Sequence, residues 1–146
     1  MKIKIIENPD LEDEVIIECK KLTPEIEQLV SQFQPLEIRV QHRGTDLTIP
    51  IHDILFFETE GDNVYVHLTD ISYKSKYRLY ELETLLPDTF ARISKSTIVN
   101  IKKISAMDHR LTSARCIQFV NSHKLVYVSR MYYSDVKNKL ERRSLL

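Results

Sequence analysis

The chain has 146 residues, 42% of them hydrophobic, which allows one compact core with a short appendage but not two full-sized domains. Its apolar runs are far shorter than the ~20 residues of a membrane helix, and its N-terminus lacks the apolar block of a signal peptide, so we expect a cytoplasmic protein. The formal net charge is zero, yet residues 1–70 hold 6 Lys/Arg against 15 Asp/Glu, and residues 71–146 hold 15 against 6. This split fits a surface that faces nucleic acid, although subunit contacts or solvation would explain it as well.

Residues 1–37 are expected to form a small β/α appendage. Apolar residues at 3–6 and 15–19 predict two short strands, and Thr23 before Pro24 predicts the start of a helix that Pro35 ends. Four apolar residues follow at helical spacing: Ile26, Leu29, Val30 and Phe33. This stripe needs a partner surface, which is either the following module or a second copy of the chain.

From residue 38 the apolar period shortens to two, which indicates strands. Eight strands are predicted, at residues 38–41, 47–50, 54–59, 63–69, 72–78, 98–101, 116–120 and 125–128. Leu79, Leu82 and Leu86 predict a brief helix between the fifth and sixth strands. A terminal helix is expected from Arg130, with Val136 on its apolar side. Residues 38–146 should therefore form a mainly β domain.

Cationic and hydroxyl side chains gather at three places in this domain. A strand at 72–78 would place Lys74, Lys76 and Arg78 on one face, which suits a phosphate backbone but also an ordinary solvated face. The segment 90–104 presents a second group, namely Arg92, Ser94, Lys95 and Ser96. Such a mixture can hold phosphates and reach base edges, or it can be a simple polar turn.

The third place is the start of the terminal helix. Ser129 can cap backbone amides there, and the planar fork of Arg130 matches the two acceptors on the major-groove edge of guanine. A capped helix start that bears an incidental arginine is the competing interpretation.

Four sequence blocks together resemble the LytTR DNA-binding domain family over about residues 38–140. They are IPIHDILFFETEGDNVYVHL at 49–68, LETLLP at 82–87, FARISKSTIVN at 90–100 and VSR at 128–130. The resemblance implies several short antiparallel strands in small sheets with little helix, and loops rather than a recognition helix that enter DNA. The implied function is that of a sequence-specific transcription regulator of double-stranded DNA.

Carried over by position, the resemblance assigns the contacts with DNA. Base contacts are expected from Asn63, Lys95 and Arg130. Backbone contacts are expected from Lys76, Arg92, Ser94, Ser96 and Ser129. Two positions depart from the family pattern: Asp62 stands where a cation is common and would repel phosphate unless it accepts from a cytosine amine, and Met131 replaces a second basic residue.

The resemblance also bears on partners. Residues 1–37 are too few for a receiver domain, so the chain resembles the stand-alone type of regulator, controlled by its abundance or by a partner such as a membrane protein. Binding to paired sites implies a homodimer, for which the stripe at Ile26–Phe33 is the candidate surface.

An enzyme is not expected. The five histidines lack metal-ligand spacing, Cys19 and Cys116 lack a CxxC pattern and are expected to be small packing residues, and two glycines cannot build a phosphate-binding loop. We therefore predict no cofactor, no metal and no small-molecule substrate. The alternative function is a non-catalytic protein-interaction module or anti-regulator that retains the same fold.

Overall fold

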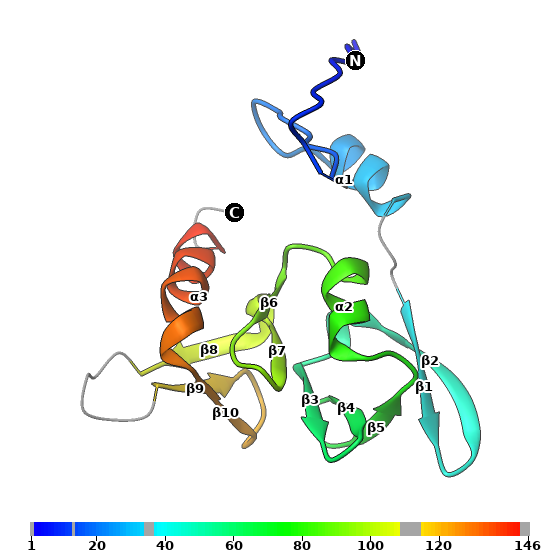
Figure 1. The fold of residues 1–146 in the computed structure, drawn as a ribbon, viewed down its shortest axis with the longest axis vertical. Coiled ribbons are helices and arrows are strands. Elements are labelled where there is room, and N and C mark those ends of the chain that lie inside the picture. The colour runs from blue at the N-terminus through cyan, green and yellow to red at the C-terminus, as the bar shows by residue number, and fades with distance from the viewer. Residues whose placement is uncertain (1, 13, 34–36, 109–114, 144–146) are drawn as a thin grey trace.

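The computed structural model describes residues 2–12, 14–33, 37–108 and 115–143. The chain forms two antiparallel sheets; helix α2 (Leu79–Leu85) packs on one face of the larger sheet, helix α3 (Arg130–Arg143) packs with the smaller sheet, and α1 (Pro24–Ser31) stands apart (Figure 1). The strands are β1 (Glu37–His42), β2 (Thr45–Pro50), β3 (Phe56–Glu60), β4 (Asn63–His67), β5 (Ser72–Ser75), β6 (Phe90–Arg92), β7 (Thr97–Asn100), β8 (Ile104–Met107), β9 (Arg115–Phe119) and β10 (Leu125–Val128). Two short 3-10 helices, η1 (Ile51–Asp53) and η2 (Ile101–Lys103), follow β2 and β7.

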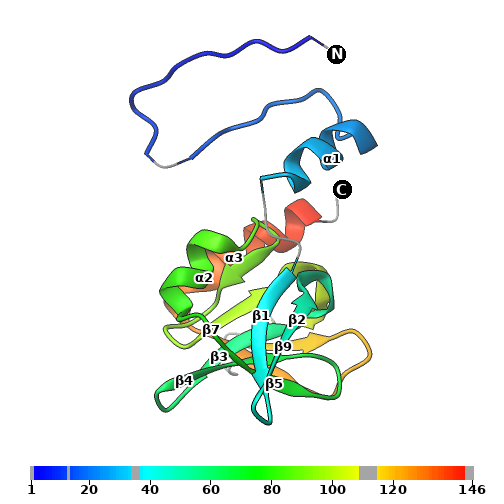
Figure 2. The same ribbon diagram turned by 90° about the vertical axis from the view of Figure 1, so that its right-hand side faces the viewer.

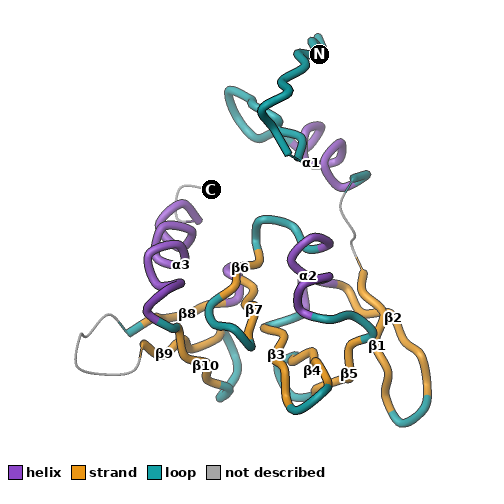
Figure 3. The backbone as a smooth tube through the Cα atoms, viewed as in Figure 1, coloured by secondary structure: helices purple, strands orange, loops and turns teal. Residues whose placement is uncertain are grey.

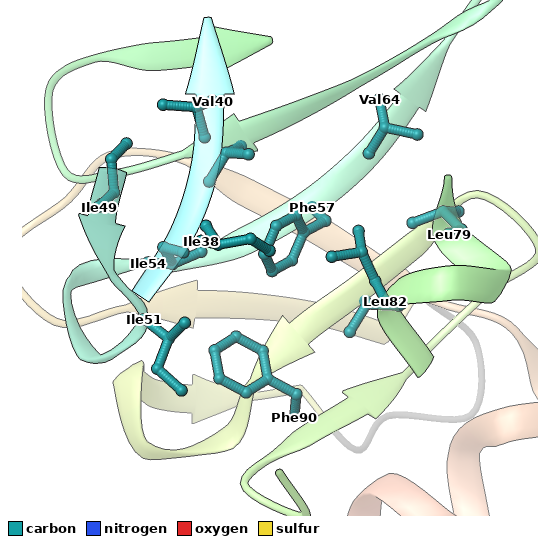
Figure 4. Close-up of a cluster of buried hydrophobic side chains, with 12 residues drawn as sticks. Ile38, Val40, Ile49, Ile51, Ile54, Phe57, Val64, Leu79, Leu82 and Phe90 are labelled. Carbon is teal, nitrogen blue, oxygen red and sulfur yellow. The ribbon is translucent and has the colours of Figure 1, made fainter. Parts of the chain in front are cut away.

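The larger sheet has seven strands in the order β2-β1-β5-β4-β3-β7-β6. Alternate side chains of its strands point toward α2 and form a core of twelve buried residues around Phe57, which is fully buried (Figure 4). Leu79 and Leu82 are the helix residues in this core, as their helical spacing predicts. The helix therefore covers the centre of the sheet.

The smaller sheet, in the order β10-β9-β8, covers the opposite face of β3 and β7. Phe56, next to Phe57 in β3, points to this side and stacks on Phe119 at 5.3 Å between ring centroids. Val136 of α3 is fully buried in the same cluster. Adjacent residues of one strand thus anchor two separate cores, because side chains alternate across a strand.

Helix α3 is held against the domain by its basic residues. One guanidinium nitrogen of Arg143 donates to the carbonyls of Ile101 and Ile104, at 2.6 and 2.7 Å. Lys139 donates from its ammonium to the Phe90 carbonyl at 3.2 Å. Part of the positive charge in the second half of the sequence therefore serves packing.

Most predicted strands are confirmed, with three differences. β6 and β8 were not predicted, because each is short and neither shows a clear alternation in sequence. The strand predicted at 72–78 ends at Ser75, where the buried hydroxyl accepts from the Tyr77 N–H and donates to the Tyr77 carbonyl. This side-chain turn ends the strand, so the prediction that Lys74, Lys76 and Arg78 form one row was wrong.

The N-terminal part differs more from expectation. Residues 3–6 and 15–19 are not strands, and the first of these runs is part of the extended trace beyond α1 (Figure 2). Their apolar side chains are exposed, as is Cys19, so the expectation that Cys19 packs inside was wrong.

The helix predicted after Thr23 is confirmed, with the Thr23 hydroxyl accepting from the Ile26 N–H as an N-cap. Pro35, which was expected to end it, lies outside the described residues. The apolar stripe of α1 is only partly covered: Ile26, Leu29 and Val30 are half-buried, no helix residue is fully buried, and Phe33 beyond its end is 77% exposed.

A polar contact joins the two sheets beside their aromatic stack. His67 of β4 lies flat on Phe56 at 4.3 Å, and the Lys124 ammonium lies 3.4 Å from its Nδ1 atom. Burial first, and the Lys124 charge second, lower the pKa of His67 to about 4. The ring is therefore neutral at physiological pH and can accept a hydrogen bond from Lys124.

We expect this contact to make stability depend on pH. Because the pKa of His67 is lower in the folded chain than its ordinary value of 6.5, its contribution is complete above about pH 6.5 and is lost as pH falls toward about 4. His67→Phe should keep the stacking and lose this dependence, so that its free energy of unfolding falls by about 1 kcal/mol less than wild type between pH 7 and 5. Urea unfolding at several pH values measures this, with exposed His123→Asn as the control. Equal pH slopes for wild type and His67→Phe would contradict it.

Candidate functional site

Three connections meet along one edge of the domain: the turn from β3 to β4, the turn from β6 to β7, and the segment from β10 to α3. The Thr59 N–H donates to the Ser96 carbonyl, and the Ser129 N–H donates to the Ile93 carbonyl, both at 2.8 Å. The middle turn, residues 93–97, is thus fixed by main-chain bonds to both neighbours. In Figure 3 this turn is the loop between the two sheets.

The middle turn is also closed internally. The Ile93 N–H donates to the Thr97 carbonyl at 3.0 Å, and the Ser96 N–H donates to the Ser94 hydroxyl at 3.2 Å. The two serine hydroxyls lie 3.3 Å apart. Two serine side chains therefore provide polar contacts within this turn, while the side chain of Ile93, its first residue, is fully buried.

Arg92 contributes further bonds to this turn. Its Nε atom donates to the Ser94 carbonyl at 2.8 Å, and its Nη2 atom donates to the Lys95 carbonyl. Its Nη1 atom forms a 2.8 Å ion pair with Glu83 of α2, and its side chain is only 21% exposed. The guanidinium that was expected on a phosphate is thus directed toward the chain itself.

Two long cationic side chains remain on the outside of the site. Lys95, at the tip of the middle turn, and Arg130, the first residue of α3, are exposed. Within the part of the chain that the structure describes, neither side chain forms a hydrogen bond or an ion pair. Asn63 and Ser129 are half-buried beside them, in the outer two connections. The backbone bonds thus bring together the connections that carry Asn63, Lys95, Ser129 and Arg130.

The remaining predicted cations lie elsewhere or have other contacts. The Lys76 ammonium forms a 2.8 Å ion pair with Asp46 of β2, away from the three connections. Lys76 first and Gln41 second, through hydrogen bonds, lower the pKa of Asp46.

Arg78 precedes α2, and its Nη1 atom lies 3.5 Å from the Asp62 carbonyl in the β3–β4 turn. Sequence reasoning missed this contact and the role of Glu83, because both partners are distant in the chain.

Carboxylates border the site on the β3–β4 side. Glu60 and Asp62 are exposed, and Glu58 is half-buried between Tyr65 and Thr97 in the sheet register. Burial first, and the Glu60 charge second, raise the pKa of the Glu58 carboxyl. The turn that carries Asn63 is therefore more acidic than the other two connections, and its carboxylates would repel a phosphate group.

The rest of the described chain offers little other chemistry. No group of three His, Cys, Asp or Glu side chains in it could hold a metal ion. None of the described helices combines the length and apolar character needed to cross a membrane. A groove of about 780 Å³ lies between α1 and the domain, lined in part by Val30, Ile51 and Phe90.

Comparison with known proteins gives matching results. Residues 45–141 match the model of the LytTr DNA-binding domain family. An uncharacterized HTH-type transcriptional regulator of Staphylococcus aureus NCTC 8325 is 28% identical, over 96% of this chain and 98% of the relative, and its counterpart from strain MRSA252 is 27% identical over the same shares. A solved LytTr DNA-binding domain of a putative methyl-accepting/DNA response regulator from Bacillus cereus superposes with a TM-score of 0.66 and 26% identity, covering 73% of this chain and 97% of that one.

Proposed function

The chain belongs to the LytTR DNA-binding domain family of transcription regulators, and on that premise we propose that it reads a specific duplex by inserting loop residues into the major groove. The observation that carries this proposal is the pair of main-chain hydrogen bonds that join residues 93–97 to Thr59 and Ser129. These bonds hold the turn that bears the exposed Lys95 beside the segment that bears Arg130. No two helices in the described residues are joined by a short turn, so these loops, rather than a helix pair, are the elements we assign to DNA.

We assign the base contacts to Asn63, Lys95 and Arg130. The arginine fork can donate to both acceptors of a guanine, the lysine ammonium can reach the same edge, and the asparagine amide matches adenine. The acidic surroundings of Asn63 favour a base edge over a phosphate for that residue, because carboxylates repel the backbone.

Phosphate contacts are assigned to residues around these three. Ser94, Ser96 and Ser129 carry hydroxyls at the same connections, and Lys76 supplies a cation farther along the sheet. To reach a phosphate, Lys76 must leave Asp46. Arg92, the remaining expected phosphate contact, has three of its five guanidinium N–H groups bound within the chain, so we assign it no phosphate.

The same assignment divides the chain into two parts. Residues 38–146 form the DNA-binding domain, and residues 1–37 form an appendage for association with a second copy through the partly exposed stripe of α1. Such a dimer would match paired DNA sites, and its action would lie in the cytoplasm with the DNA. The exposed apolar residues near the N-terminus, including Ile5 and Val15, suit a regulatory partner, for which the family resemblance suggests a membrane protein.

Selection of bound duplexes from a random pool tests the function directly. We expect one preferred sequence, and we expect its affinity to fall steeply with salt, with a slope of log K against log salt of about −3 or steeper, because several phosphates are neutralised. Fluorescence anisotropy of the selected and a scrambled duplex measures both. Absence of preference together with salt-independent affinity would favour the protein-interaction module instead.

Substitutions separate base contacts from phosphate contacts. Lys95→Ala and Arg130→Ala should each weaken binding of the selected duplex by about 1–3 kcal/mol and relax the preferred sequence. Lys76→Ala should weaken all duplexes alike, whereas Asp46→Asn, which releases Lys76, should strengthen all alike. The same anisotropy series measures these effects. A uniform loss on Arg130→Ala would demote this residue to a phosphate contact.

The dimer has its own test in the full chain. Leu29→Glu, which places a charge on the α1 stripe, should halve the mass measured by light scattering, because a charge cannot be buried in an apolar interface without a partner. Gln28→Glu, on the exposed side of the same helix, serves as the control. An unchanged mass for Leu29→Glu would remove α1 from the interface.

A further inference from the structure

The bonds of Arg92 suggest a role that differs from a contact with DNA. Three of the five guanidinium N–H groups are already engaged, two by carbonyls of the middle turn and one by a carboxylate of α2. The carbonyls belong to Ser94 and Lys95. Arg92 therefore holds Lys95, which bears the exposed cation at the tip of the turn, through its main-chain carbonyl. Charge-assisted bonds from one rigid, planar group to three separate acceptors fix geometry as well as adding energy.

The orientation of Arg92 follows from the strand that carries it. In β6, Phe90 and Arg92 point toward α2, whereas Ala91 between them points into the other core. The guanidinium therefore meets Glu83 on the surface of α2 and turns back over the loop that follows its own strand. One residue thus links the helix to the turn.

Helix α2 meets the site at a second point. Arg78, at its N-terminus, reaches toward the Asp62 carbonyl of the β3–β4 turn, and its N–H donates to Glu81 at 3.0 Å. The helix itself is anchored in the sheet core by fully buried Leu82. A rigid element thus contacts two of the three connections, and the shorter and stronger of these contacts is the one through Arg92.

We propose that Arg92 and Glu83 are a positioning pair that sets the angle at which Lys95 meets DNA, and so contributes to sequence discrimination rather than to phosphate affinity. This inference rests on the proposed function, since it concerns the same turn. A base contact demands a fixed donor position, whereas attraction to a phosphate tolerates a mobile one. Loss of the pair should therefore reduce preference for the selected sequence and leave general attraction to DNA unchanged.

Anisotropy on the full chain tests this with the selected duplex and a scrambled duplex of equal length. Arg92→Lys keeps the charge but loses the fork, so we expect about a tenfold loss on the selected duplex, with the scrambled duplex and the salt slope unchanged. Glu83→Gln should give a loss of about threefold on the selected duplex alone. Asp88→Asn, which removes a nearby exposed charge without touching Arg92, is the control and should shift both duplexes equally.

A double substitution shows whether Arg92 acts through Lys95. In a Lys95→Ala background, Arg92→Lys should change discrimination by less than about twofold, because the side chain that it positions is gone. Independent, additive losses would contradict the positioning role. Thermal melting of each variant identifies any that unfold. If Arg92→Lys unfolds, the same comparison is made with Glu83→Gln alone and with Glu83→Gln in the Lys95→Ala background.

Two results would overturn the inference while leaving the function intact. The first is a salt slope reduced by about one on Arg92→Ala but not on Arg92→Lys, with equal losses on both duplexes, which is the behaviour of a phosphate contact. The second is that Glu83→Gln binds both duplexes more tightly, by the same factor as Asp88→Asn. Such a result would mean that the substitution only removes a negative charge that repels DNA. A wild-type chain without any sequence preference would instead contradict the proposed function itself.

Discussion

Two main-chain hydrogen bonds organise the edge of this protein that we assign to DNA. The Ser96 carbonyl accepts from the end of β3, and the Ile93 carbonyl accepts from the residue that precedes α3. Because both acceptors belong to one short turn, the three connections cannot move independently without breaking a bond at 2.8 Å. The position of each exposed side chain at this edge depends on that constraint, since Ile93 is also buried between the bonds.

Positive charge in the second half of the chain has two different uses. Arg143 and Lys139 bind carbonyl groups and hold α3 on the domain, and Arg92 binds the turn and Glu83. Lys95 and Arg130 remain exposed and unpaired within the described residues. The charge excess therefore overstates the number of cations available to DNA.

Much of the domain followed from the sequence, because its strands and helices show clear apolar periods. Leu79 and Leu82 give α2 correctly, and Thr23 caps α1 as its hydroxyl predicts. The failures have local causes. The hydroxyl of Ser75 ends a strand early, and the apolar residues at 3–6 have no neighbouring strand to pair with, so β-propensity alone did not make them strands. Family resemblance predicted that Arg92 contacts phosphate, but not that Arg92 is directed inward, because its partner Glu83 is identified only by the packing of α2.

The most direct test of the account is a map of backbone amide chemical shifts during titration of the full chain with its selected duplex. We expect the largest changes together at residues 61–63, 94–96 and 129–131, with smaller ones at α2, because the three connections move into contact as one edge. Changes confined to α1 or to the hairpin of β1 and β2, with residues 94–96 unaffected, would contradict the claim that these loops form the DNA-binding edge.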